Sequence, residues 1–321
     1  MLAFHGNASA AVGDTKVARW KDDRTAAFLL MFDDGWPSHW QVAIPEMQKR
    51  GLIGTFYINP AKGEFKKFED KWKNEIPKTG VVVFGDHTMT HQGVKDVENA
   101  EYEIGECANY IRSITKKPKP ELVSYAQPGV GEGKWNLSDE DTKVILAKHK
   151  LIDRPTFRGH GAVYHLKTTE EMLALADKAV AAKGMEYLVI HGVERIEPNW
   201  GYQDFWPLKQ DVFFPLLDGL KERSEKGELW ITDHITQHKY EAQRDTAALN
   251  VLRRSPSGIA LELTCSVDPE LYDGALTLIT EVPKSWTKAT VTQNDKNTEV
   301  EVKDGFLKYD ALPGVIRLTP H

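Results

Sequence analysis

The sequence of 321 residues has few cysteines, no long apolar run and no excess of positive charge. Because only Cys107 and Cys265 are present, a fold built on several disulfides is excluded. No stretch approaches the roughly 18 consecutive apolar residues of a spanning helix, so we expect no membrane span. Lys and Arg number 41 against 47 Asp and Glu, a formal net charge of −6. That balance argues against a nucleic acid partner, because phosphate binding needs clustered cations.

The length suggests about two domains, at roughly 150 residues each. We expect residues 1–24 to form an N-terminal extension, in which the small residues Ala8 to Ala11 are interpreted as the remainder of a removed export signal. We predict a barrel domain over residues 25–250 and an accessory domain over residues 255–321.

Between residues 25 and 250, short apolar runs alternate with helical segments, which is typical of a parallel sheet in an α/β protein. The expected strands are Ala26–Phe32, Thr55–Ile58, Val81–Phe84, Leu122–Tyr125, a weaker one within Leu151–Phe157, Tyr187–Ile190 and Leu229–Ile231. Both an open doubly wound sheet and a closed barrel fit this alternation.

Polar residues at the ends of these strands favour the barrel. They are Asp33, Asp34, His87, Gln127, Arg158 and His191. In a barrel the carboxyl ends of the strands converge on one mouth, whereas an open sheet spreads them along a line. We therefore predict a distorted (β/α) barrel of about seven strands.

The pattern changes to strand alternation near the C-terminus. Apolar residues alternate with polar ones from Leu261 to Val267, and Asp304-Gly305 is typical of a hairpin turn. We predict a small antiparallel, β-sandwich-like domain over residues 255–321, joined through the polar stretch from Arg253 to Ser257.

Three local features contain candidate catalytic or metal-binding residues. Asp33 and Asp34 end the first strand, and adjacent residues of an extended segment point in opposite directions, which favours two different roles. His87 and His91, at i and i+4, would share one face of a helical turn and reach one metal ion. His191 follows another strand. Singly, each feature has a plainer interpretation: a turn, a solvated helix face or a packed histidine.

Together these motifs resemble those of the polysaccharide deacetylases, also called the NodB-homology domain or carbohydrate esterase family 4, over about Thr25 to Arg244. Met31–Gly35 is similar to the first motif of the family, His87–His91 to the second and Val189–His191 to the fifth. The resemblance implies a barrel with fewer than eight strands, a divalent metal and hydrolysis of acetyl groups from a polymeric sugar.

The resemblance also implies roles. Asp34, His87 and His91 match the metal ligands, a set suited to Zn²⁺ and open to Co²⁺ or Ni²⁺. Asp33 matches the general base and His191 the general acid.

Two motifs depart from the family pattern. The third usually carries an Arg and an aromatic residue beside a proline, whereas this chain has Gln127-Pro128-Gly129 and offers no Arg there. A main-chain N–H near Gly129 is still expected to bind the oxyanion. Arg158 is matched to the Arg that orients the catalytic Asp. Gly192 stands where an Asp usually follows the fifth-motif histidine, so the partner of His191 is open.

Four aromatic residues are candidates for stacking on sugar rings: Trp36, Trp200, Tyr202 and Trp206. We expect one or two of them to contact the substrate and the others to pack in the core or in loops. The expected partner is an acetylated polysaccharide or oligosaccharide, which places the protein outside the cell or in the envelope. We predict a metal-dependent deacetylase that favours N-acetyl over O-acetyl groups. Two alternatives are a non-catalytic carbohydrate-binding protein on the same fold and a hydrolase of C–N bonds in small molecules. The polymer and the oligomeric state stay open.

Overall fold

The computed structural model describes residues 11–116, 121–155, 166–196 and 202–321. Its contacts divide the chain into two units, residues 25–237 and residues up to 24 together with 238–321. The division differs from the predicted boundaries, because residues 15–17 pair with a C-terminal strand instead of forming a separate extension. No helix within the described ranges combines the length and apolar character needed to cross a bilayer.

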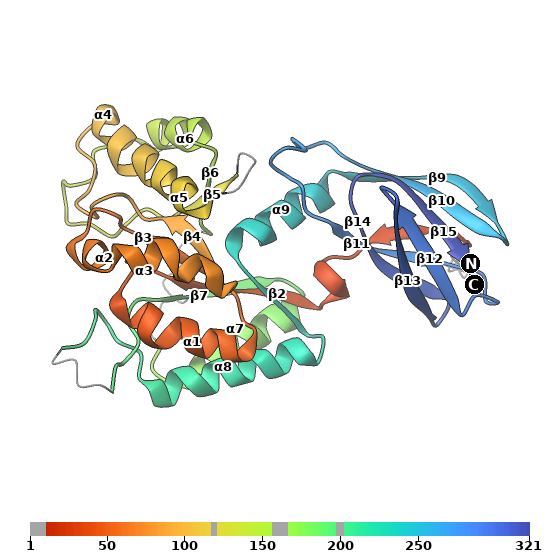
Figure 1. Ribbon diagram of the computed structural model, residues 1–321, viewed down its shortest axis with the longest axis horizontal. Coiled ribbons are helices and arrows are strands. Elements are labelled where there is room, and N and C mark those ends of the chain that lie inside the picture. Colours follow the sequence, from red (N-terminus) through yellow and green to blue (C-terminus); the bar gives the residue numbers. More distant parts are fainter. Residues whose placement is uncertain (1–10, 117–120, 156–165, 197–201) are drawn as a thin grey trace, which may run out of the picture. The chain divides into compact units, whose positions relative to one another are not determined.

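The first unit contains the seven predicted parallel strands (Figure 1). They are β2 (Ala26–Phe32), β3 (Gly54–Ile58), β4 (Val82–Asp86), β5 (Val123–Tyr125), β6 (Leu151–Asp153), β7 (Met185–Ile190) and β8 (Leu229–Thr232). Six follow the order β6-β5-β4-β3-β2-β7, and β8 pairs with β2. Within the described ranges no ladder joins β6 to β7, so the sheet is a distorted, open barrel of the predicted class.

Strand β2 is buried on both faces, as its unbroken apolar sequence predicts. Phe28, Leu30 and Phe32 belong to the large core that the helices cover. Leu29 and Met31 point to the other face, where they join a smaller cluster with Tyr57. Alternate side chains of the strand thus pack on the outer and the inner face of the sheet. Polar side chains follow at the carboxyl end, where the strand stops.

Helices connect the strands and cover the outer face (Figure 1). They are η2 (His39–Ala43), α1 (Ile44–Arg50), α2 (Gly63–Lys67), α3 (Glu69–Asn74), η3 (Ile76–Thr79), α4 (Val97–Ala100), η4 (Glu101–Glu106), α5 (Cys107–Thr115), α6 (Asp139–Lys148), α7 (Thr169–Ala182) and α8 (Gln210–Glu225). Helix α9 (His234–Asp245) runs from the first unit into the second.

The second unit is an antiparallel sheet of eight strands. They are β1 (Thr15–Val17), β9 (Ala247–Ser255), β10 (Gly258–Cys265), β11 (Leu276–Glu281), β12 (Lys288–Gln293), β13 (Lys296–Lys303), β14 (Phe306–Ala311) and β15 (Gly314–Pro320), with η1 (Lys21–Asp23) after β1. The order is β1-β11-β14-β13-β12-β15-β10-β9. The predicted hairpin turn at Asp304-Gly305 is present, with both residues at positive φ.

The prediction that residues 253–257 link two domains is wrong. β9 runs to Ser255 and pairs with β10 along its length, so this stretch is a hairpin inside the sheet. The strand was missed because its apolar and polar residues do not alternate in step with its two faces: Leu252 is exposed, as are Arg253 and Arg254.

Candidate active site

The carboxyl ends of the parallel strands surround a cavity of about 600 Å³. Its lining residues are Asp33, Asp34, Trp36, Lys62, His87, His91, Gln127, Gly129, Arg154, Val189, His191, Phe205 and Trp206. The structure thus gathers at one mouth the described residues that the sequence placed at strand ends.

Asp33 and Asp34 follow β2 directly, and both are buried. The chain leaves the strand conformation at once, because Asp34 has φ +79° and Gly35 φ +63°. The expectation that the two carboxylates point in opposite directions is therefore wrong. An oxygen of each lies 3.9 Å from His87 Nε2, so both carboxylates face the same imidazole.

The two histidines meet through a loop and not through the predicted helical turn. Residues 87–92 follow β4 without helical structure, and both Thr88 and His91 have positive φ, +65° and +60°. The His91 N–H donates to Thr88 Oγ1 over 3.1 Å, which closes the loop on itself. The imidazole centroids are 5.1 Å apart.

Buried polar groups hold this loop. Glu103, on η4, accepts from the Thr90 N–H (2.9 Å) and the Thr90 hydroxyl (2.7 Å). Asp86 accepts from the Thr88 N–H over 2.9 Å, and burial raises the pKa of Asp86 to about 8. The Asn59 amide donates to the carbonyls of His87 and Thr88. Main chain that belongs to no helix or sheet is thereby fixed in one conformation.

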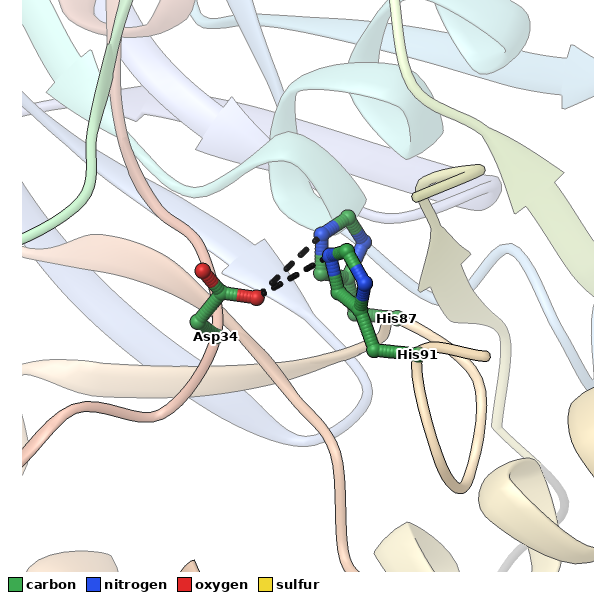
Figure 2. A group of neighbouring side chains, drawn as sticks. All are labelled: Asp34, His87 and His91. Atoms are coloured by element: carbon green, nitrogen blue, oxygen red, sulfur yellow. Dashed lines mark ion pairs between the residues drawn. The ribbon is translucent and has the colours of Figure 1, made fainter. Parts of the chain in front are cut away.

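Asp34, His87 and His91 form a group that fits a metal ion (Figure 2). Their candidate ligand atoms all lie within 4.8 Å of one another, and Asp34 Oδ1 is 3.2 Å from His91 Nε2. This buried oxygen has no hydrogen-bond partner of good geometry among the described residues, although the Lys62 ammonium lies 3.1 Å from it. His87 Nδ1 donates to the Ala126 carbonyl over 2.7 Å, which leaves the Nε2 lone pair directed at the group. One carboxylate and two imidazoles are a donor set that suits zinc.

The protonation states agree with this use. Burial lowers the pKa of His87 to about 4, so its imidazole is neutral near pH 7, as a ligand must be. Burial opposes the charge on Asp33, but the Arg154 guanidinium, together with the neighbouring His87 and His191 imidazoles, outweighs it and holds the pKa of Asp33 well below its ordinary value. For Asp34, too, the neighbouring His87, Lys62 and His91 outweigh burial and lower the pKa. Both aspartates are therefore ionised.

Among the described residues, the arginine beside Asp33 is Arg154. Arg154 Nη1 donates to Asp33 Oδ1 and Oδ2 at 2.8 and 3.0 Å. Arg158 lies outside the described residues. Arg154 follows β6 directly, and its N–H donates to the Tyr125 carbonyl. The strand predicted within residues 151–157 is β6, which ends at Asp153, so Arg154 is the residue that follows it directly.

His191 follows β7 and lines the same cavity. Its main-chain carbonyl accepts from Nε2 of the buried His39. Its ring meets Phe205 and Trp206 edge-on, with centroids 5.6 and 5.4 Å away. Its Nδ1 is buried and has no hydrogen-bond partner among the described residues, as Gly192 in place of a carboxylate would give.

The aromatic predictions have different outcomes. Trp36 and Trp206 line the cavity, and Trp206 is 47% exposed and stacked on Phe205. Tyr202 does not line it, and its ring lies 4.8 Å from the Arg195 guanidinium. Trp200 lies outside the described residues. Gly129 lines the cavity as predicted.

The sequence interpretation missed Lys62, Arg154 and Phe205 among the residues of the lining. Arg154 alone had a local signal, as the first basic residue after a strand. Lys62 and Phe205 reach the cavity from connecting segments, where spacing gives no indication.

Two sequence comparisons bear on the site. Residues 21–139 match the family model described as polysaccharide deacetylase. The gellan lyase of a Bacillus species is 23% identical over 335 positions, which cover 96% of this chain. The chain spans only 13% of the length of that protein.

The solved structures that are similar to this chain share little sequence with it. The peptidoglycan deacetylase PdaC from Bacillus subtilis is 14% identical with a TM-score of 0.44, covering 69% of this chain and 94% of that one. The family 4 carbohydrate esterase from Streptomyces lividans in complex with acetate is 15% identical with a TM-score of 0.43, and the match covers 64% of this chain and 90% of that one. A CE4 family pseudoenzyme from Bacillus anthracis is 15% identical with a TM-score of 0.42, and the match covers 64% of this chain and 63% of that one.

The family match includes both the paired aspartates after β2 and the paired histidines after β4. These motifs lie together in an open α/β barrel whose mouth carries the cavity. Residues 21–139, which carry both motifs, are therefore similar to the polysaccharide deacetylase family.

Proposed function

We propose that this chain is a metal-dependent hydrolase that removes acetyl groups from a polysaccharide, N-acetyl in preference to O-acetyl. The observation that carries the proposal is the convergence of Asp34, His87 and His91 beside a second ionised carboxylate, Asp33. Three protein ligands leave open positions on an ion, as hydrolytic metal sites require.

Asp33 is the proposed general base. It is ionised, and it is not needed as a ligand, so it can accept the proton of the attacking water. Arg154 holds both of its oxygens and so fixes the direction of the carboxylate. A divalent ion held by Asp34, His87 and His91 would supply a Lewis acid that polarises the acetyl carbonyl and acidifies water.

His191 is the proposed general acid, and it lines the same cavity as Asp33. Its task is to protonate the leaving nitrogen, because an amine leaves poorly without a proton. The main-chain N–H at Gly129 is the proposed donor to the oxyanion. Trp36 and Trp206, both in the cavity lining, are the proposed faces for sugar rings.

The proposed ion is zinc, with cobalt or nickel as alternatives, and the proposed location is outside the cell or in the envelope. A polymeric substrate supports that location, because such chains are met outside the cytoplasm.

His191 Nδ1 has no hydrogen-bond partner in the part of the chain that the structure describes, which favours one alternative. A histidine whose tautomer is not set is a weaker acid catalyst, so a carbohydrate-binding protein without turnover is the second candidate.

Acetate release from acetylated chitooligosaccharides, peptidoglycan and acetylxylan, with zinc and with a chelator, tests the proposal. We expect zinc-dependent release that Asp34→Ala abolishes. Asp70→Ala, an exposed aspartate of α3, is the matched control. Glycan binding without release in the presence of zinc, cobalt or nickel would establish the alternative.

A further inference from the structure

Lys62 is a cation in the cavity lining that the proposed mechanism does not use. Its Nζ lies 3.1 Å from Asp34 Oδ1 and 4.5 Å from the centroid of the Trp36 ring, and its side chain is 26% exposed. The Trp36 indole N–H in turn donates to Asp34 Oδ2 over 3.0 Å. The ammonium thus lies between a candidate metal ligand and a candidate sugar-stacking face.

The main chain fixes the position of Lys62. Its N–H donates to the Asn59 carbonyl over 3.0 Å, and the Ala61 N–H donates to the Met89 carbonyl over 2.8 Å. Met89 belongs to the loop that carries both histidines. The turn that presents Lys62 is therefore bonded to the loop that presents the proposed metal ligands.

Lys62 shares its carboxylate oxygen with the proposed metal site. Asp34 Oδ1 faces Lys62 Nζ, His91 Nε2 and, at 3.9 Å, His87 Nε2. Two cations so close to one oxygen would repel each other, so a divalent ion held by Asp34, His87 and His91 would weaken the contact of the ammonium with Asp34. The face of Trp36 still attracts it and keeps it within the cavity.

The other Lys or Arg in the described lining is Arg154, whose Nη1 is bonded to both oxygens of Asp33. Lys62 is then the cation that remains for a ligand. We infer that Lys62 binds an anionic substituent of the sugar chain, a carboxylate or a sulfate, beside the acetyl group that is removed. This inference rests on the proposed deacetylase function.

The test measures acetate release by the full chain, loaded with zinc, from three N-acetylated oligosaccharides of equal length. One is neutral, one carries carboxylates and one carries sulfates. We expect the wild-type kcat/KM to be about tenfold higher on one or both anionic substrates, the effect of one charge-assisted hydrogen bond in a partly exposed site. The substrate with the higher kcat/KM shows whether the bound anion is a carboxylate or a sulfate.

Lys62→Met should lower kcat/KM about tenfold more on the preferred anionic substrate than on the neutral one, chiefly through KM. Lys62→Arg should retain part of the preference, because it keeps the charge. Lys66→Met, an exposed lysine of α2 outside the cavity lining, should leave the preference unchanged. Zinc affinity, measured by calorimetry, should be no weaker in Lys62→Met than in wild type, since a competing cation is removed.

The preference for an anionic substrate decides whether Lys62 has the inferred role. Acetate release without any preference for an anionic substrate, or with the same preference in Lys62→Met, overturns the role of Lys62 and leaves the deacetylase proposal standing. No release from any of the substrates by the zinc-loaded wild type overturns the deacetylase proposal, and this inference with it.

Discussion

Arg154 donates from one nitrogen to both oxygens of Asp33, at 2.8 and 3.0 Å, and both side chains are largely buried. The pair joins the segment after β6 to the segment after β2, two strands that are not neighbours in the sheet. A buried carboxylate that is ionised, oriented and adjacent to a candidate metal site is what a general base requires.

Replacing Arg154 by Met should leave Asp33 buried without its partner. We expect the free energy of unfolding to fall by about 3 kcal/mol, the cost of an uncompensated buried charge. The pKa of Asp33 should rise, so the acidic limb of the pH dependence of kcat/KM should move to higher pH. Chemical denaturation and a pH–rate profile measure the two effects.

Arg158→Met is the matched control for this variant, because the sequence alone favoured Arg158 for the same role. Equal pH profiles for Arg154→Met and wild type would show that Arg154 does not set the pKa of the base. A shifted profile for Arg158→Met would instead assign that role to Arg158.

Glu103 is a positioning residue for the histidine loop, because both of its oxygens accept hydrogen bonds from Thr90. Glu103→Gln turns one acceptor into a donor, so one of these bonds is lost. We expect zinc affinity to fall about tenfold, at the lower end of what the partners of metal ligands contribute. Calorimetry measures the zinc affinity of Glu103→Gln and of Glu106→Gln, an exposed neighbour. Both variants lose one negative charge, so a difference between them reports the hydrogen bonds of Glu103 to the loop. Identical affinity in both variants would show that the loop needs no support from Glu103.

His39 makes stability depend on pH. Burial lowers its pKa to about 4 from an ordinary 6.5, and its buried Nδ1 has no hydrogen-bond partner among the described residues. Between these pH values the unfolded chain binds a proton that the folded chain does not, so stability falls as the pH is lowered from 6.5 to 4. The loss assigned to His39 is about 3 kcal/mol.

Urea denaturation of metal-free protein at several pH values measures this loss. His39→Gln keeps a donor for the His191 carbonyl but does not titrate, so its stability should vary less over the same range. A slope equal to that of wild type would contradict the assignment.

His191 should matter more for amides than for esters. An amine leaving group needs a proton in the transition state, whereas an alkoxide needs it less. We expect His191→Asn to lower kcat about 100-fold or more on an N-acetylated oligosaccharide and by a smaller factor on an O-acetylated one. Equal losses on the two substrates would mean that His191 does not protonate the leaving group.

The sequence was sufficient for the barrel. Ala26–Phe32 reads as a strand buried on both faces and is one, because an unbroken apolar run of that length has few other solutions. It was insufficient where the apolar residues of a strand do not follow its two faces, as in β9, or where the backbone takes positive φ.

For the site, the sequence indicated the candidate ligands but not their geometry. The spacing of His87 and His91 suits a helix, yet Thr88 and His91 adopt left-handed conformations that only the hydrogen bonds from Glu103, Asp86 and Asn59 explain. Those partners come from other segments, and no local pattern identifies them. Lys62 was missed for the same reason, since its contact with Asp34 depends on how the turn after β3 packs against the histidine loop.

The most direct test of the proposed metal site is the anomalous signal at the zinc absorption edge from crystals grown with one equivalent of zinc. We predict a single strong peak in contact with Asp34 Oδ1, His87 Nε2 and His91 Nε2, and no peak there in Asp34→Ala. A zinc peak elsewhere on the chain with none between these three side chains, or an undiminished peak in Asp34→Ala, would contradict the proposed site.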